Sequence, residues 1–307
     1  MRFVTLAAWI PVVFFFGSNS ALRAAEVPAP AHDKAYWRSI VAQNYAVPEG
    51  GSPFELIVEL TGSLGSADPE LRDEFGYGIP SAWIYRDKLL AVADLGTLRR
   101  LWQSKLSLGI GAAQDEAVLL RSFSALDLSV LAALDNEWPF LEAAAFEELL
   151  QSAIDYLSRE KDVRGFVPGT GWHHSSAHTA DLLKFLGRNR RLKPADQDRI
   201  LAAIGAKLTS AGAVYVWGED DRFARAVLSL LRRADFSAES FNRWVDARAS
   251  EWSAVWTTEP FDPMKFVAAQ NGKNLLKSLL VLLSSVDSFP ARDASRERVL
   301  AAVARMG

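Results

Sequence analysis

Apolar residues recur at spacings of three and four along most of the chain beyond residue 50. This periodicity is typical of amphipathic α-helices, whereas half-buried strands alternate apolar and polar residues. Alternation is nearly absent, and one short stretch, 213–217, fits either a strand or an apolar loop. We therefore expect an all-α fold. The predicted helices include 54–60, one starting at 70, 115–135, 139–159, 172–187, 195–208, 220–234, 238–249 and 273–286.

The predicted helices fall into antiparallel pairs that repeat along the chain. Leu182–Leu186 resembles Val227–Leu231, displaced by about 45 residues, and each segment is followed by a basic turn and a second helix. A period of about 40–47 residues with two helices per unit is typical of HEAT and armadillo repeats. The sequence thus predicts paired antiparallel helices, arranged as an irregular HEAT- or armadillo-like array or as a compact α-bundle.

The first residues predict export. Arg2 precedes an apolar run of about 14 residues, and small and polar residues follow as far as Ala25. This layout is typical of a secretory signal peptide, and the run is shorter than the roughly 20 residues of a spanning helix. We expect a signal peptide at 1–25, a linker at 26–50 and a single all-α domain at 51–307. The expected location is periplasmic or secreted, with membrane contact only through the export signal.

Composition excludes several classes of function. The chain has no cysteine, which excludes disulfides, thiol nucleophiles and iron–sulfur clusters. Its formal net charge is −3, so it lacks the dense basic surface of a nucleic-acid-binding protein. Half of the residues are hydrophobic, which is incompatible with general disorder.

Three of the four histidines lie together where a glycine- and proline-rich loop runs into a predicted helix. On that helix His174, His178 and Asp181, spaced by four and three residues, fall within an arc of roughly 60°. Trp172 and Arg164 flank them, and the loop amides beside Arg164 are suited to an anion. We take these five residues as the candidate polar or ligand-binding site.

Three interpretations of this cluster are open. The simplest is a hydrogen-bonded structural network, since buried polar groups need partners. The second is a zinc-like divalent metal held by His174, His178 and Asp181, with further ligands from 219–221 on a neighbouring helix. Ser175 stands where a zinc protease has its glutamate, so that motif is absent. The third is a catalytic or ligand-binding site. No other cofactor is evident.

Part of this segment resembles a known family. The residues concerned are Arg164-Gly165-Phe166 and Gly171-Trp172-x-His174-x-x-Ala177-His178-x-Ala180-Asp181, with shorter pieces at 77–84, 121–124 and 218–222. They resemble the hallmark of the bacterial domain-of-unknown-function family numbered 2785. The resemblance implies a mostly helical domain in which His174, His178 and Asp181 belong to the family pattern. It implies no activity, substrate or cofactor.

The sequence contains no complete catalytic motif, and we assign no catalytic residue and no enzyme class. We expect an exported, soluble all-α protein that binds a peptide, a protein or a small ligand. The alternative is a metal-binding protein or metal-dependent hydrolase centred on the histidine cluster.

Overall fold

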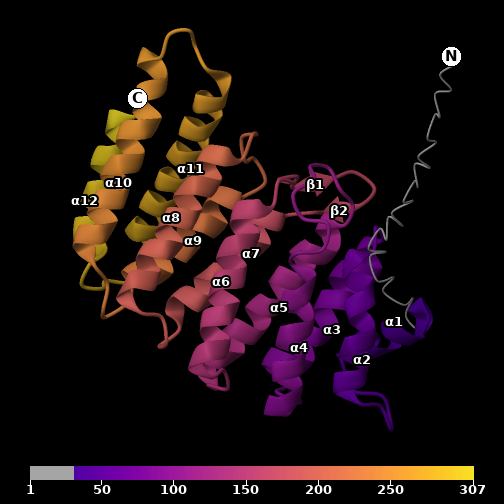
Figure 1. Cartoon of the computed structure of the whole chain (residues 1–307). Helices are drawn as coiled ribbons and strands as arrows, with labels where there is room; N and C mark the ends of the chain where they lie inside the picture. Colours follow the sequence, from indigo (N-terminus) through magenta and orange to yellow (C-terminus); the bar gives the residue numbers. More distant parts are fainter. Residues whose placement is uncertain (1–30) are drawn as a thin grey trace, which may run out of the picture.

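Helices make up nearly all of the regular structure in the computed structural model, which describes residues 31–307 (Figure 1). Strands in this part of the chain are limited to β1 (Phe166–Val167) and β2 (Gly171–Trp172), which pair antiparallel. The predicted all-α class is therefore confirmed. The predicted signal peptide at 1–25 lies outside the described residues.

The predicted helical ranges beyond residue 115 overlap the central helices, although α11 begins ten residues before the predicted start at 273, and residues 213–217 form a loop. The α-helices are α1 (Lys34–Ala42), α2 (Pro53–Leu60), α3 (Ile79–Ser81), α4 (Val92–Lys105), α5 (Val118–Glu137), α6 (Ala143–Arg159), α7 (Ser175–Arg188), α8 (Pro194–Ser210), α9 (Glu219–Leu231), α10 (Ala238–Ser253), α11 (Pro263–Ser285) and α12 (Arg292–Arg305). Short 3₁₀ helices are η1 (Thr61–Gly65) and η4 (Ala254–Thr257), and the wider π-helical segments are η2 (Glu70–Gly78) and η3 (Ala82–Arg86).

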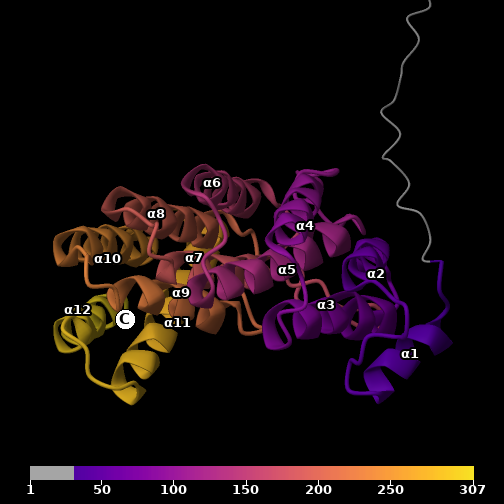
Figure 2. The same cartoon turned by 90° about the horizontal axis from the view of Figure 1, so that it is seen from below.

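The central helices form two rows. Helix α7 packs between α5 and α9, and α9 packs in turn against α11. The second row, α6, α8 and α10, covers the first, as Figure 2 shows from below. Helices α7, α9 and α11 begin at residues 175, 219 and 263, so each start follows the previous one by 44 residues. The repeat in the sequence is thus a repeat of helix pairs, and it places the equivalent faces of α7 and α9 side by side.

Several helix starts follow the expected capping chemistry. The Asp262 carboxylate accepts hydrogen bonds from the amides of Met264 and Lys265, and Pro263 occupies the first turn, where no amide proton is needed. Asp68 accepts from the Glu70 amide at the predicted start of η2. These caps satisfy backbone donors that a helix cannot pair internally.

Within the predicted linker, 26–50, the described residues 31–50 include a helix. Residues 34–42 form α1, in which Trp37 and Ile40 are buried in the core, and the Asp33 side chain caps its first turn by accepting from the Tyr36 amide. The apolar residues at 37 and 40 are spaced by one helical turn, and their burial fixes the helix against η2. Linker composition in the flanking residues concealed this short amphipathic helix.

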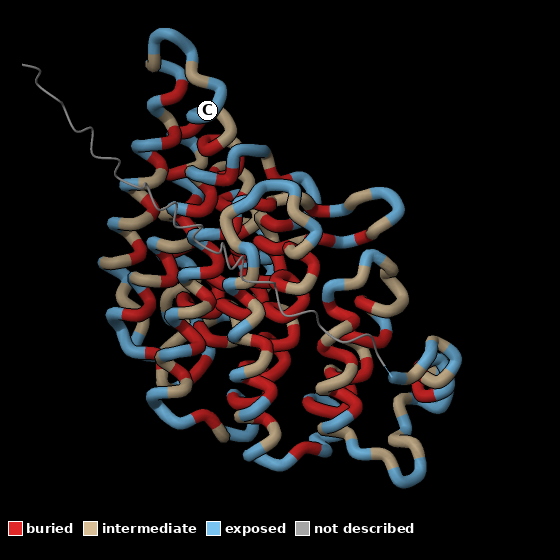
Figure 3. The backbone as a smooth tube through the Cα atoms, turned by 45° about the vertical axis from the view of Figure 1, so that its right-hand side comes forward, coloured by how far each residue is buried: buried red, intermediate tan, exposed pale blue. Residues whose placement is uncertain are grey.

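One continuous cluster of buried hydrophobic side chains runs from Trp37 to Met306. Figure 3 shows that buried residues follow the inner sides of the helices, while the loops are exposed. The apolar run of α11 belongs to this core, through Leu275, Leu276 and Leu279. No helix within 31–307 combines the length and the apolar character needed to cross a membrane.

Candidate functional site: a pocket around His174 and His178

The β1–β2 hairpin sets the position of the histidines. Its pairing continues through the amide of His173, which donates to the carbonyl of Gly165, and the amide of His174, which donates to that of Arg164. His174 then adopts a left-handed backbone conformation with φ of 44°, and α7 begins at the next residue. The prediction that the helix starts at 172 was therefore wrong, because the hairpin pairing holds 171–174 out of the helix.

His178 lies within the first turns of α7 and is 7% exposed. Its Nδ1 is 2.8 Å from Oγ of Ser122, and the same hydroxyl donates to the carbonyl of His173 at 2.5 Å. A carbonyl only accepts, so the single Ser122 proton goes to His173 and the hydroxyl accepts from Nδ1–H of His178. This arrangement leaves a lone pair on Nε2 of His178, at the opposite edge of the ring.

Both imidazoles are neutral at pH 7. Burial, reinforced by His174 and Arg222, holds the pKa of His178 well below its usual range. Burial and the Arg222 guanidinium lower the pKa of His174 to about 4. Neutral imidazoles offer one donor and one acceptor each, so the pair is equipped for hydrogen bonding.

His174 is held by stacking. Its ring lies 4.3 Å from the indole ring of Trp172, with 29° between the two planes. Its Nε2 is buried without a hydrogen-bond partner and lies 3.8 Å from Oε1 of Glu219 on α9. The neighbouring helix thus supplies a carboxyl group near the histidines, as the repeat pattern predicted, and burial raises the pKa of that carboxyl.

Asp181 lies on α7 as predicted, but its carboxylate is held by two cations. It accepts from Nζ of Lys184 at 2.8 Å and from Nη1 of Arg222 on α9. A metal ion on His174, His178 and Asp181 would have to displace both. Within residues 31–307, no group of three or more histidine, cysteine, aspartate or glutamate side chains is placed to hold a metal ion.

These side chains surround an open pocket of about 450 Å³, which we call the histidine pocket. Side chains from η2, α5, β2, α7, α9 and the loop before α9 line it. The lining residues are Asp73, Tyr77, Phe123, Leu126, Trp172, His174, His178, Trp217 and Arg222. Three predicted residues, Trp172, His174 and His178, therefore meet at one cavity, and Asp181 supports it through Arg222.

Arg164 lies apart from this pocket. Its guanidinium donates to both carboxylate oxygens of Asp162, which is 2% exposed, and reaches Glu116 at 3.2 Å. It lines another cavity, together with Val163 and Gly165. Arg164 was predicted to lie with the histidines, but it does not line their pocket, because the Asp162 carboxylate holds the Arg164 side chain.

Asp73, Tyr77 and Trp217 line the histidine pocket but were not among the predicted site residues. Asp73 and Tyr77 come from the π-helical segment η2, about a hundred residues before the histidines. Trp217 comes from the apolar loop before α9. A signal for some of the missed lining residues was present, since Tyr77, Phe123 and Arg222 lie within the shorter segments that resemble the family.

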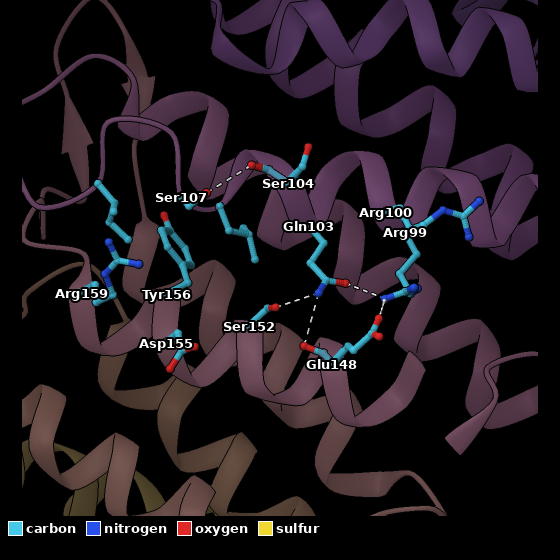
Figure 4. Close-up of a pocket in the computed structure, with 12 residues that line it drawn as sticks. Arg99, Arg100, Gln103, Ser104, Ser107, Glu148, Ser152, Asp155, Tyr156 and Arg159 are labelled. Atoms are coloured by element: carbon cyan, nitrogen blue, oxygen red, sulfur yellow. Dashed lines mark hydrogen bonds and ion pairs between the residues drawn. The ribbon is translucent and has the colours of Figure 1, made fainter. Parts of the chain in front are cut away.

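A second pocket, of about 350 Å³, lies between α4 and α6 (Figure 4). Several of its polar groups bond to one another: Nη1 of Arg99 donates to Gln103, and Nε2 of Gln103 donates to Ser152 at 2.8 Å. Arg99 also pairs with Glu148 at 3.2 Å. These groups already have partners, so this pocket is less suited to a ligand than the histidine pocket.

Comparison with known proteins gives one match. No curated protein and no solved structure is similar to the chain at a significant level. The family model described as "Protein of unknown function (DUF2785)" matches residues 106–281. This range is more than half of the chain and includes α5, α7, α9 and the hairpin, and with them most of the histidine pocket. The chain therefore belongs to the DUF2785 family.

Proposed function

We propose that this chain is an exported binding protein that holds a small ligand in the histidine pocket. The observation that carries the proposal is the conformation of His174. A left-handed backbone at a residue other than glycine costs on the order of 1–3 kcal/mol and is concentrated at functional sites. Here it holds a neutral imidazole, with an unpartnered Nε2, against Trp172 at the wall of a cavity.

The composition of the pocket also suits a small ligand. Apolar and aromatic walls with a few polar groups are typical of ligand sites, and cavities of about 300–1,000 Å³ are usual. Phe123 and Leu126 supply apolar wall, while His178 presents an acceptor and Arg222 a donor. A stable complex with a folded protein would bury on the order of 800 Å² on each partner.

Ligand binding can be tested by thermal unfolding in the presence of neutral sugars, amino acids, nucleosides, carboxylates and quaternary amines. We expect at least one class to stabilise the protein, by about 2.7 kcal/mol at 100 times its Kd. Trp172→Ala and His178→Gln should abolish that stabilisation. Trp256→Ala is the matched control, because Trp256 is 63% exposed and lies outside the pocket.

Two results would contradict this proposal. If the ligand stabilises all variants equally, it binds elsewhere. If untagged protein contains stoichiometric metal that His178→Ala loses, the site is the metal centre of the alternative hypothesis.

Export is part of the proposal and is supported by the signal-like sequence of residues 1–25. We expect the mature protein, purified from fractionated cells, to lie outside the cytoplasm and to begin near residue 26. N-terminal sequencing of the processed chain checks this. Protein that stays in the cytoplasm and retains Met1 would show the prediction to be wrong.

A further inference from the structure

The rim of the histidine pocket carries a cluster of exposed aromatic rings. Phe166, Trp172 and Trp217 are 41%, 37% and 47% exposed. The ring centroids of Trp172 lie 5.0 Å from Phe166 and 6.0 Å from Trp217, and both pairs are edge-to-face. Grouped aromatic exposure of this kind marks a binding surface rather than a core.

Trp217 is held in place by two features of the fold. Its indole lies against the backbone of Gly165, where an added Cβ would be only 2.1 Å from Cδ1 of the indole. Its amide donates to the Glu219 carboxylate at 2.9 Å. The exposed indole is therefore positioned by the loop and by α9, and glycine at 165 is required for its placement.

The charged groups of the pocket have ion-pair partners within the protein. Arg222 pairs with Asp181, and Oδ1 of Asp73 lies 2.8 Å from Nε of Arg72. The two histidines facing the pocket are neutral. The pocket therefore has no free counter-ion for a charged ligand, whose charge would be partly desolvated without a partner. A neutral ligand does not have this cost.

The remaining chemistry favours hydroxyl groups. His178 offers an accepting lone pair, Asp73 offers the carboxylate oxygen that Arg72 does not hold, and Arg222 offers N–H donors. A hydroxyl group both donates and accepts, so several hydroxyls on one ring would match this mixed set. The flat indoles at the rim suit an apolar C–H face.

From these four observations, and resting on the proposed binding function, we propose that the ligand of the histidine pocket is a neutral carbohydrate. One face of its ring packs on the indole of Trp217, and the Trp172 indole, whose plane lies at 82° to that of Trp217, borders the edge of the ring. Its hydroxyl edge bonds His178, Asp73 and Arg222.

The test is a calorimetric titration of the full mature chain with sugars that share a ring but differ in charge. Glucose, galactose, mannose, N-acetylglucosamine and their disaccharides are compared with glucuronate and with protonated glucosamine. We expect a neutral sugar to bind at least tenfold more tightly than its charged counterparts. Trp217→Ala should weaken binding by about threefold to tenfold, as expected for loss of an aromatic contact.

Gly165→Ala tests the positioning of the rim. This variant should weaken sugar binding as much as Trp217→Ala does, because the added methyl group displaces the Trp217 indole. The melting temperature of the variant reports whether it folds. Trp256→Ala should leave binding unchanged. If no neutral sugar binds, or a charged class binds more tightly and still needs Trp172, the carbohydrate inference is overturned while the binding function stands. Sugar binding that is insensitive to all pocket variants would overturn both.

Discussion

Arg121→Met is expected to lower the free energy of unfolding by about 3–5 kcal/mol, because it leaves a buried carboxylate without its counter-ion. Nε and Nη2 of Arg121 donate to the two carboxylate oxygens of Glu160, at 2.6 and 3.1 Å. The two side chains are 0% and 2% exposed. The guanidinium also donates to the carbonyl of Leu108 at 2.8 Å, a bond that methionine cannot replace. Urea unfolding measures the loss.

Two further variants separate this effect from general damage. Replacing both partners, in Arg121→Met with Glu160→Met, should recover part of the stability, since apolar pairs of similar volume often replace buried ion pairs without loss. The Leu108 carbonyl and the Asp162 amide still lose their partners. Arg225→Met breaks the exposed pair with Asp221, whose side chains are 48% and 41% exposed, and should cost less than about 1 kcal/mol. A loss as small in Arg121→Met as in Arg225→Met would show that the buried pair contributes no stability.

This ion pair lies at the start of the loop that connects α6 to α7 and carries Trp172 and His174. Glu160 follows α6, its carboxylate accepts from the Asp162 amide, and its carbonyl accepts from the buried Lys207 at 2.5 Å. Ser175 at the start of α7 donates to the carbonyl of Asp162. Loss of the pair therefore loosens both ends of the loop that carries Trp172 and His174.

The helical repeat was predictable because its cause is local. A helix that buries one face needs apolar residues every three to four positions, and equivalent helices repeat that pattern. Helices α4 and α12 were not predicted. In α12 the buried residues are Ser295, Val299 and Ala302, whose small side chains give a weak pattern. The residues of α12 are buried by packing against α10 and α11, and these contacts cannot be predicted from the sequence of α12 alone.

The site was predictable only in part for a related reason. The spacing of His178 and Asp181 was enough to place both on α7, but the partner of Asp181 is Arg222 from α9, which depends on packing between two repeats. The left-handed turn at His174 follows from hairpin pairing with Gly165 and Arg164. Such contacts arise between segments, so spacing within one helix could not show them.

Helix α5 contains two buried aspartates, Asp127 and Asp135, that differ in their hydrogen bonding. Each is 1% exposed. Asp135 accepts at Oδ1 from the amides of Phe140 and Leu141, both at 2.7 Å, and at Oδ2 from the side-chain amide of Asn189 at 2.6 Å. Both oxygens of Asp127 lack a hydrogen-bond partner. Burial raises the pKa of Asp127 well above its ordinary value of 3.8.

The same substitution should therefore have opposite effects at these two positions. Asp135→Asn is expected to lower the free energy of unfolding by about 1–3 kcal/mol, because its new amide group faces the N–H donor of Asn189.

Asp127→Asn should raise the free energy of unfolding at pH 8 by about 1–2 kcal/mol. It removes a buried carboxyl group that at this pH must either carry a buried charge or hold a proton that the solvent would remove. A folded-state pKa above the unfolded value means that wild-type stability declines as the pH rises above about 4. The advantage of Asp127→Asn, measured by urea unfolding at successive pH values, should accordingly shrink toward acid pH, and an advantage independent of pH would contradict the assignment of this buried carboxyl.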